Sequence, residues 1–570
     1  MDNYFKKAEE YFNDDNYKKA IEYCDKSIEK GLYLKDAYCL KANAECYISN
    51  GKDDKILEDA LKNINIAIEN DNQDAWLFFI KALVYQHMNK FEDALVEINK
   101  AIHLKKGYFY YNIRGNLNKS LNRKKEALSD FTLSIEMQDD TYNYNDRGEL
   151  YYDMDEYSLA RQDLQRAVEL DDKNVYAWKN LGRTLNCLDL FEMAISAFDT
   201  AIQLEPDDDF LYYLKSLSQK SLNNYKESLK NINKAIEIDP EYSDYYRKRG
   251  NLYFDWTEEN TNSENTDLDK EFSFYANQKK SERHLILAEK DFKKAIKFDD
   301  ENILAYWSLI KVYKYRKDDK KQIEVFDKLE KLTPNDETVY SERGLAKMKL
   351  GEYENAIVDF TKFLEFESAS DDDIAAAYGN RGVCYTQLEK DEEALSDLDI
   401  AVEMCPSAQA FVNRGVAKSF AMSQDEAIED YKKALELEPD FPEAYFNIGI
   451  SQYKQNLFEK AIENYFTAYD FKIKKQQKPC IENYIERFYD SLKGLFGEKK
   501  YKKTVNICNK IIKLGIKHEK IYNLKCAAKI MLGKYEDALT ACNIALKLNP
   551  KFEPAKINLK IIKQNLKKQK

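Results

Sequence analysis

Small and apolar residues recur at helical spacing in the stretch Ala410–Pro439, and most of its other positions are polar. Phe411 and Gly415 lie four residues apart, one helical turn, so an aromatic ring stands beside a residue that has no side chain. Beyond a short polar turn, Ala427 and Tyr431 repeat this spacing on a second apolar stripe. Pro439 ends the pattern, because proline lacks the amide hydrogen that a helix needs. The stretch therefore predicts two helices joined by a short turn.

The same pair of helices is predicted along the whole chain. The small residue at the place of Ala427 recurs at intervals of mostly 33 or 34 residues, and four intervals are longer. A fixed period of this length indicates a repeat protein, in which each unit buries its apolar face against its neighbours. Fifteen units follow from the residues at this place: Ala20, Ala60, Ala94, Ala127, Ala160, Ala194, Ser228, Ala288, Gln322, Ala356, Ala394, Ala427, Ala461, Thr504 and Ala538.

Two further places support the repeat. Each first helix carries an aromatic residue four residues before its own contact residue: Tyr4, Tyr38, Phe78, Tyr111, Tyr144, Trp178, Tyr212, Tyr246, Tyr306, Tyr340, Tyr378, Phe411, Tyr445, Phe488 and Tyr522. Proline follows the small residue of the second helix by twelve residues in six units: Pro206, Pro240, Pro334, Pro406, Pro439 and Pro550. Proline at this place ends a helix and directs the chain into the next hairpin.

A unit of this length with this aromatic, Gly, Ala and Pro pattern resembles the tetratricopeptide repeat family. The resemblance covers essentially the whole chain. It implies an all-α fold, an α-solenoid in which about fifteen helical hairpins form a right-handed superhelix, closed by a C-terminal capping helix. It also implies that first helices line a concave groove and that the protein is a non-catalytic scaffold or adaptor for protein partners.

The spacing of the units predicts four segments. They are 1–240 with units one to seven, 241–300 with unit eight, 301–471 with units nine to thirteen, and 472–570 with the last two units and a basic capping helix. Unit eight holds an insertion at about 255–285 that is polar, acid-rich and without helical periodicity, which predicts a disordered loop. A lid or docking segment is the alternative, since Phe272, Phe274 and Tyr275 lie in it.

Charge and cysteine content limit the function classes. The net charge of -13 disfavours a general nucleic-acid surface, which needs an excess of basic residues. The ten cysteines include no CxxC pair, and Cys24, Cys508 and Cys542 share one repeat position, so we expect packed, reduced thiols. No apolar run is long enough for export or for a membrane span, which predicts a cytoplasmic protein.

Six units place an arginine directly before the contact glycine of the first helix. The same six units, and no others, carry an aspartate three residues after the small residue of the second helix. This pairing predicts a salt bridge between the two helices of one hairpin, because a guanidinium binds a carboxylate through two parallel hydrogen bonds. The predicted pairs are Arg114–Asp130, Arg147–Asp163, Arg249–Asp291, Arg343–Asp359, Arg381–Asp397 and Arg414–Asp430.

The sequence offers no catalytic, cofactor or metal-binding motif. The four histidines are far apart and none has metal-ligand spacing, and neither a phosphate-binding glycine loop nor a nucleophile motif is present. We therefore expect no enzymatic activity and no bound metal or cofactor. The function that remains is binding of protein or peptide partners.

The predicted binding site is the groove of units eleven to thirteen. If the contact residue of a first helix is counted as position 8, the family's geometry puts positions 2, 5, 6, 9, 12 and 13 in the groove. Asn380, Asn413 and Asn447 all occupy position 6, where amides can hydrogen-bond an extended peptide. Val383, Gln387, Val412, Val416, Phe420, Phe446, Ile450 and Tyr453 complete the predicted lining. The alternative is that asparagine merely suits a crowded polar place beside the arginine bridge.

A second hypothesis places function at the basic C-terminal end. Residues 551–570 hold an excess of lysine, and Lys499, Lys500, Lys502 and Lys503 precede them. Such charge can associate the chain with an acidic partner or an anionic surface. A solvated capping helix is the other interpretation of the same residues. Salt separates this hypothesis from groove binding, since screening weakens charge-led binding most.

Overall fold

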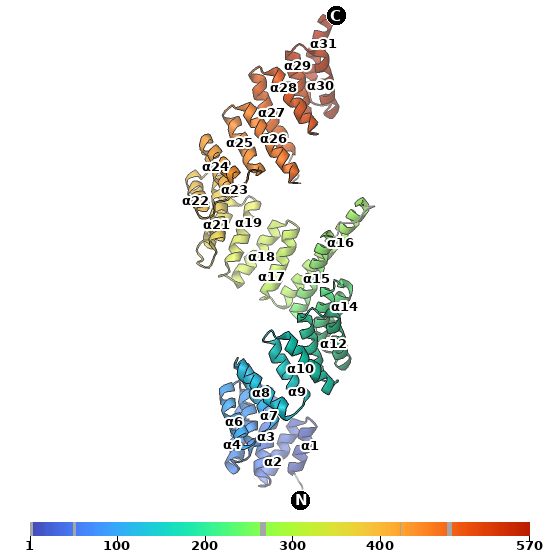
Figure 1. Cartoon of the computed structure of the whole chain (residues 1–570), viewed down its shortest axis with the longest axis vertical. Coiled ribbons are helices and arrows are strands. Elements are labelled where there is room, and N and C mark those ends of the chain that lie inside the picture. Colours follow the sequence, from blue (N-terminus) through green and yellow to red (C-terminus); the bar gives the residue numbers. More distant parts are fainter. Residues whose placement is uncertain (1–3, 50–52, 263–269, 422, 476–480, 570) are drawn as a thin grey trace. The chain divides into compact units, whose positions relative to one another are not determined.

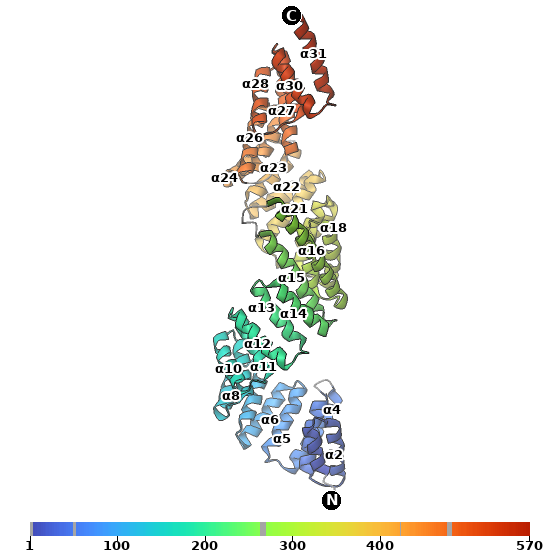
Figure 2. The same ribbon diagram turned by 90° about the vertical axis from the view of Figure 1, so that its right-hand side faces the viewer.

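The computed structural model describes residues 4–49, 53–262, 270–421, 423–475 and 481–569. Within them the chain forms 31 α-helices and no strand, so the predicted all-α solenoid of helical hairpins is confirmed (Figures 1 and 2). The chain divides into two compact units, residues 1–308 and residues 309–570, and the division falls inside α17. On either side of α17 and α18, each repeat consists of two consecutive helices that pack side by side.

The helices up to the division are α1 Tyr4–Asn13, α2 Tyr17–Glu29, α3 Leu34–Ser49, α4 Asp54–Asn70, α5 Ala75–His87, α6 Phe91–Leu104, α7 Tyr108–Ser120, α8 Lys124–Met137, α9 Thr141–Tyr152, α10 Tyr157–Leu170, α11 Val175–Cys187, α12 Phe191–Leu204, α13 Asp209–Ser221, α14 Tyr225–Ile238, α15 Ser243–Asn262, α16 Lys270–Phe298 and α17 Ile303–Tyr315. Odd-numbered helices are the first helices of their units, and even-numbered helices are the second.

The remaining helices are α18 Asp319–Leu332, α19 Glu337–Lys349, α20 Tyr353–Phe363, α21 Asp371–Gln387, α22 Asp391–Met404, α23 Ala408–Phe420, α24 Gln424–Leu437, α25 Pro442–Lys454, α26 Phe458–Lys474, α27 Ile481–Gly497, α28 Tyr501–Lys513, α29 Glu519–Met531, α30 Tyr535–Leu548 and the capping helix α31 Glu553–Gln569. Each of the six repeat prolines lies two residues after the end of a second helix, as the sequence predicted.

A left-handed residue closes most hairpin turns. It lies five residues before the small residue of the second helix, where Asn and Asp are common because their side chains tolerate positive φ. Asn122 and Asp155 are examples. Lys317, Glu389 and Lys499 adopt the same conformation without that advantage, so their turns store strain.

Within each hairpin, the contact residue of the first helix is matched in size to a residue of the second helix. A methyl group added to Gly182 would lie 2.5 Å from a ring carbon of Phe198, and one added to Gly415 would lie 2.5 Å from the ring of Tyr431. Unit fourteen holds the opposite arrangement, since the large Leu492 of its first helix lies in one buried cluster with the smaller Cys508 of its second. The prediction of packed thiols is confirmed, and burial raises the pKa of the Cys508 thiol to about 12.

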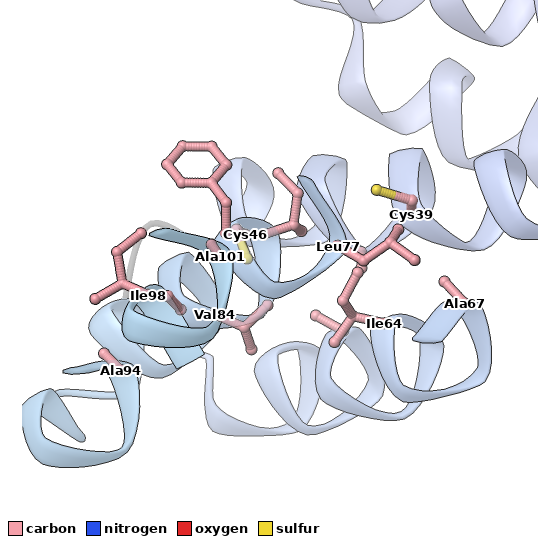
Figure 3. Packing of buried hydrophobic residues seen from close by; sticks show 14 of the residues in the cluster. Cys39, Cys46, Ile64, Ala67, Leu77, Val84, Ala94, Ile98 and Ala101 are labelled. Carbon is pink, nitrogen blue, oxygen red and sulfur yellow. The ribbon is translucent and has the colours of Figure 1, made fainter. Parts of the chain in front are cut away.

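From α3 to α7 the buried core runs from one hairpin into the next. Around α3 to α6, buried side chains such as Cys46, Ile64, Leu77 and Ile98 interdigitate across successive helices (Figure 3). Each unit therefore stabilises its neighbours, as expected for a solenoid.

The insertion of unit eight is helical where the structure describes it. α15 continues to Asn262 and α16 begins at Lys270, so the prediction of a disordered loop is wrong for these residues. The two helices pair through aromatic contact, with the Trp256 ring 4.6 Å from the His284 ring, and such contact leaves no amphipathic pattern to find in the sequence. Residues 263–269 lie outside the described residues, as do the side chains of Phe272, Phe274 and Tyr275, on which the lid hypothesis depended.

Candidate functional site

All six predicted arginine–aspartate pairs form, each between the two helices of one hairpin. In every pair, Nε and Nη2 of the arginine donate to the two carboxylate oxygens of the aspartate. In unit twelve the distances are 2.8 Å from Arg414 Nε and 2.7 Å from Nη2 to the Asp430 oxygens. The Asp430 side chain is 1% exposed, so this bridge belongs to the packing of the hairpin and leaves no group for a ligand.

The remaining nitrogen of each arginine makes a contact that the sequence did not suggest. Nη1 donates to a side chain on the second helix of the preceding unit, always five residues after that unit's small residue. The acceptors are Asn99, Thr132, Asn233, Asp327, Thr361 and Asp399. Each arginine thus joins three helices, two of its own unit and one of the unit before.

Unit two carries a changed version of this arrangement. Asn63 occupies the aspartate place and donates 2.8 Å to the buried Glu45, while Lys41 at the arginine place reaches back to Asp25 at 2.6 Å. Burial raises the pKa of Glu45 to about 7, and the Asn63 amide and the Lys41 charge oppose the shift. This carboxyl is a structural group whose charge costs free energy near neutral pH.

Asn380 lines a hollow on the first helices. This hollow, of about 430 Å³, lies between α19 and α21 and is bordered by the loop that leads into α21. Thr338, Ser341 and Glu342 of α19, at positions 2, 5 and 6, face Asn380 across it, and Asp373 contributes a carboxylate. Groove positions of two successive units therefore border one hollow, which Leu345, Phe360 and Phe363 also line.

Asn413 and Asn447 are half-buried like Asn380. Gln409 Nε2 donates 2.7 Å to Asn413 Oδ1, so one of these amides is partly satisfied within its own helix. For Asn380 and Asn447, the described residues provide no hydrogen-bond partner to the side chain. Two of the three amides therefore retain their full capacity to bind a peptide backbone.

The predicted apolar lining is only partly open. Val412 is 3% exposed because it packs on Ala444 and Ile448 of the next first helix, so its assignment to the groove surface is corrected to the core. Val383 and Val416 are half-buried and Gln387 is exposed. Phe446, Ile450 and Tyr453 pack against the neighbouring core. Phe420 is 55% exposed and has the Lys454 ammonium over its ring.

The basic C-terminal end carries less free charge than its sequence suggests. Lys500 and Lys503 both pair with Glu459, at 2.9 Å and 2.8 Å, and Lys556 pairs with Glu553 at 2.7 Å. These ion pairs compensate part of the charge that an acidic partner would need. Lys551, Lys560, Lys563, Lys567 and Lys568 form no ion pair among the described residues, so charge-led association at this end stays a prediction.

First helices of units four to six are bridged by polar side chains. Asn112 and Asn116 donate 2.8 Å and 3.1 Å to Asp146, and Asn180 donates 3.0 Å to Asn145. Desolvation raises the pKa of Asp146, and the amide donors partly oppose this. The Asn180 side chain thus joins its own first helix to that of the preceding unit.

The sequence interpretation missed a row of aromatic residues. Position 2 of the first helix is aromatic in five successive units, and we name these residues the aromatic row: Trp76, Phe109, Tyr142, Tyr176 and Phe210. Four of them are largely exposed and Phe109 is half-buried. The sequence shows an aromatic residue at the same repeat position in five successive units, but it does not show that these side chains are exposed.

A second hollow lies at the N-terminal end of the aromatic row. Its volume is about 700 Å³, and it is lined by α1, α3 and the start of α5. Phe5, Phe12 and Trp76 give it aromatic walls, and Glu9 and Asp36 are among its acidic residues. The combination suits a cationic or aromatic side chain.

The described residues also bear on metal binding and membrane insertion. In the part of the chain that the structure describes, no group of three or more His, Cys, Asp and Glu side chains is placed to hold a metal ion. Nor does any described helix have the length and apolar character needed to cross a bilayer.

These helical hairpins define the protein as an α-solenoid. Family models match parts of it: one described as TPR repeat at residues 423–456, and two described as tetratricopeptide repeat, the first at 2–29, 211–242 and 338–369 and the second at 145–209. The chain is a tetratricopeptide repeat protein. Proteins of this family generally act as scaffolds for protein interactions and are typically non-catalytic.

Solved structures with related folds include other repeat proteins. YrrB, described as a TPR protein with an unusual peptide-binding site, is 25% identical over 31% of this chain and 92% of its own, with a TM-score of 0.28. The Cut9–Hcn1 structure is 14% identical over 93% of this chain and 96% of that chain, with a TM-score of 0.37. These TM-scores are too low to bear on function. No curated protein matches the sequence.

Proposed function

We propose that this protein is a non-catalytic adaptor that binds extended peptide segments of other proteins on the first helices of units ten to thirteen. The observation that carries the proposal is the repeated amide at position 6. Asn380 and Asn447 have no side-chain partner among the described residues, and Asn380 lies in the wall of a hollow of about 430 Å³. An amide offers a donor and an acceptor, which is what the backbone of an extended peptide requires.

The surroundings of Asn380 indicate how a peptide would be held. Thr338 and Ser341 line the hollow. The Ser341 hydroxyl donates 3.2 Å to the Thr338 carbonyl, so it can accept from a peptide N–H, while the Thr338 hydroxyl can donate or accept. Asp373 favours a ligand that carries positive charge at this point, whereas Glu342 is already paired with Lys314 at 2.9 Å. The proposed setting is the cytoplasm, where buried thiols such as Cys24 stay reduced.

A displayed library of random peptides, selected on the whole chain, tests the proposal. The strongest peptides are measured against wild type and against the triple variant Asn380→Ala, Asn413→Ala, Asn447→Ala, at low and at high salt. We expect the variant to lose about tenfold or more in affinity, since several backbone hydrogen bonds of about 1 kcal/mol each are removed. Binding should persist at high salt.

The matched control changes two exposed asparagines on second helices of the same compact unit, Asn355→Ala and Asn506→Ala. These variants should leave binding unchanged. Circular dichroism verifies that all variants fold. Selected peptides that bind the triple variant as well as wild type would refute this location.

A further inference from the structure

The aromatic row presents more apolar surface to solvent than the fold requires. Trp76 and Phe210 are 44% and 41% exposed, and Tyr142 and Tyr176 are 61% and 62% exposed. Among the described residues, no group accepts or donates a hydrogen bond at the hydroxyls of these two tyrosines. Contiguous exposed apolar surface of this kind marks an interaction site.

The row follows the stacking direction of the units. All five rings occupy the same repeat position, so the repeat symmetry puts them on one side of the first helices. The Trp76 and Phe109 rings are 6.0 Å apart, so the first two members are neighbours. α7 with α9, α9 with α11, and α11 with α13 pack directly against each other.

Ring spacing matches one type of extended ligand. Helices in direct contact have axes about 8–10 Å apart, and the Trp76 and Phe109 rings are 6.0 Å apart, so successive rings are expected at roughly 6–10 Å. A polyproline II helix advances about 3.1 Å per residue with three residues per turn, or about 9 Å per turn. A segment in this conformation, lying across the first helices, would therefore bring one residue of each turn onto one ring.

The charge beside the aromatic row further restricts the type of ligand that the row can bind. The loops that lead into α9, α11 and α13 hold seven acidic residues against one basic residue, Lys173, whereas the loop that leads into α7 holds Lys105 and Lys106; the acidic residues are Asp139, Asp140, Asp171, Asp172, Glu205, Asp207 and Asp208. Some have local structural roles, since Asp140 and Asp208 cap their helices and Asp139 pairs with Arg166. Their summed field still attracts cations and repels anions.

We propose that the aromatic row binds a proline-rich, basic segment of a partner protein in the polyproline II conformation. Prolines would stack on the rings, and lysines or arginines of the same turns would face the acidic loops. The acidic hollow beside Trp76 would take a basic or aromatic side chain at one end of the segment. Single-stranded nucleic acid also stacks on aromatic rows, but its phosphates would meet these carboxylates.

The experiment uses the whole chain and a labelled peptide of about fifteen residues with the repeat Pro-Pro-Arg, long enough to span the row at about 3.1 Å per residue. Fluorescence anisotropy gives its affinity. A peptide with the repeat Gly-Gly-Arg has the same charge without the rigid conformation, and an oligouridylate probes the nucleic-acid alternative. We expect the Pro-Pro-Arg peptide to bind at least about tenfold more tightly than the other two, since a preformed helix loses less entropy.

The decisive variant is Tyr142→Ala with Tyr176→Ala. Both side chains are mostly exposed, so the fold should survive, and the peptide should bind about tenfold or more weakly because two stacking contacts are lost. The control is Val96→Ala with Leu159→Ala, which removes exposed apolar surface of second helices instead. This control should bind like wild type.

Three results would overturn the inference. They are equal affinity for the two arginine peptides, tighter binding of the oligouridylate, and unchanged affinity in the tyrosine variant. The Asn380, Asn413 and Asn447 triple variant must also bind the peptide normally, and loss of binding there would assign the peptide to the groove of the proposed function. The two proposals therefore fail separately.

Discussion

Removal of Arg381 should destabilise its hairpin more than removal of the matching Arg414. Arg381 donates 2.7 Å and 2.9 Å to the two oxygens of Asp397, whose side chain is 7% exposed. Arg414 holds Asp430 in the same way, but Lys418 also contacts Asp430 at 2.9 Å. Among the described residues no lysine contacts Asp397. Arg381→Ala therefore leaves the buried Asp397 carboxylate without a cationic partner, whereas Arg414→Ala leaves Lys418 beside Asp430.

The expected cost of Arg381→Ala is about 3–5 kcal/mol, the range for removing one partner of a buried ion pair. For Arg414→Ala we expect roughly half of that, because the remaining lysine keeps a charged partner at hydrogen-bond distance. Unfolding of a long repeat array is not a two-state transition, so global unfolding curves would blur the difference. Hydrogen exchange followed by mass spectrometry resolves it helix by helix, and α21 and α22 should lose protection.

The double variant Arg381→Ala, Asp397→Ala is the critical control. It removes the stranded charge, so most of the protection in α21 and α22 should return. Arg381 Nη1 also donates 3.0 Å to Thr361 of the preceding unit, and this bond is not restored. α20 should therefore stay less protected than in wild type. The reasoning is refuted if Arg381→Ala exchanges like wild type, or if the double variant is as labile as the single one.

Three further variants test the structure elsewhere. Glu389 has φ of 56°, so Glu389→Gly should stabilise α21 and α22 by about 0.5–1 kcal/mol in hydrogen exchange, whereas Glu389→Ala should not. Because folding raises the pKa of Glu45 to about 7, its stabilising effect is complete below the unfolded pKa of about 4.5 and is lost as pH rises through 7. Glu45→Gln should remove this pH dependence, worth about 3 kcal/mol, from the opening of α3 and α4, measured by hydrogen exchange corrected for the intrinsic exchange rate at each pH. Gly182→Ala should lower the free energy of unfolding by about 1–3 kcal/mol. Phe198→Ile added to this variant should recover much of the loss, because the third unit combines Ala82 with Ile98 at the same two places. No recovery would contradict size matching.

The arginine bridges were predictable because both partners recur together. Arg and Asp appear in the same six units at a fixed place, and such internal correlation reports spatial contact directly. The third contact of each arginine was not predictable, because its acceptor varies among Asn, Thr and Asp and belongs to another unit. A chemically varied partner leaves no pattern in one sequence.

The candidate groove was less predictable than the fold. Position 5 was counted as groove surface, but Val412 at that position is covered by the next first helix. The extent of cover depends on how closely successive first helices approach, and that follows from side-chain volumes across two units. Position 2 behaves differently: Tyr142 and Tyr176 remain exposed there. Repeat numbering alone does not separate these cases.

Stability and recognition use different positions of the same helix. In the bridged units, position 7 joins three helices and position 8 sets the close approach within the hairpin. Position 2 at Tyr142 and position 6 at Asn380 have no comparable structural contact among the described residues, so selection for a ligand can act on them without cost to the fold. It follows that substitutions at these two residues should change binding and leave hydrogen exchange unaltered. A marked loss of protection in either variant would show that the two roles are not separate.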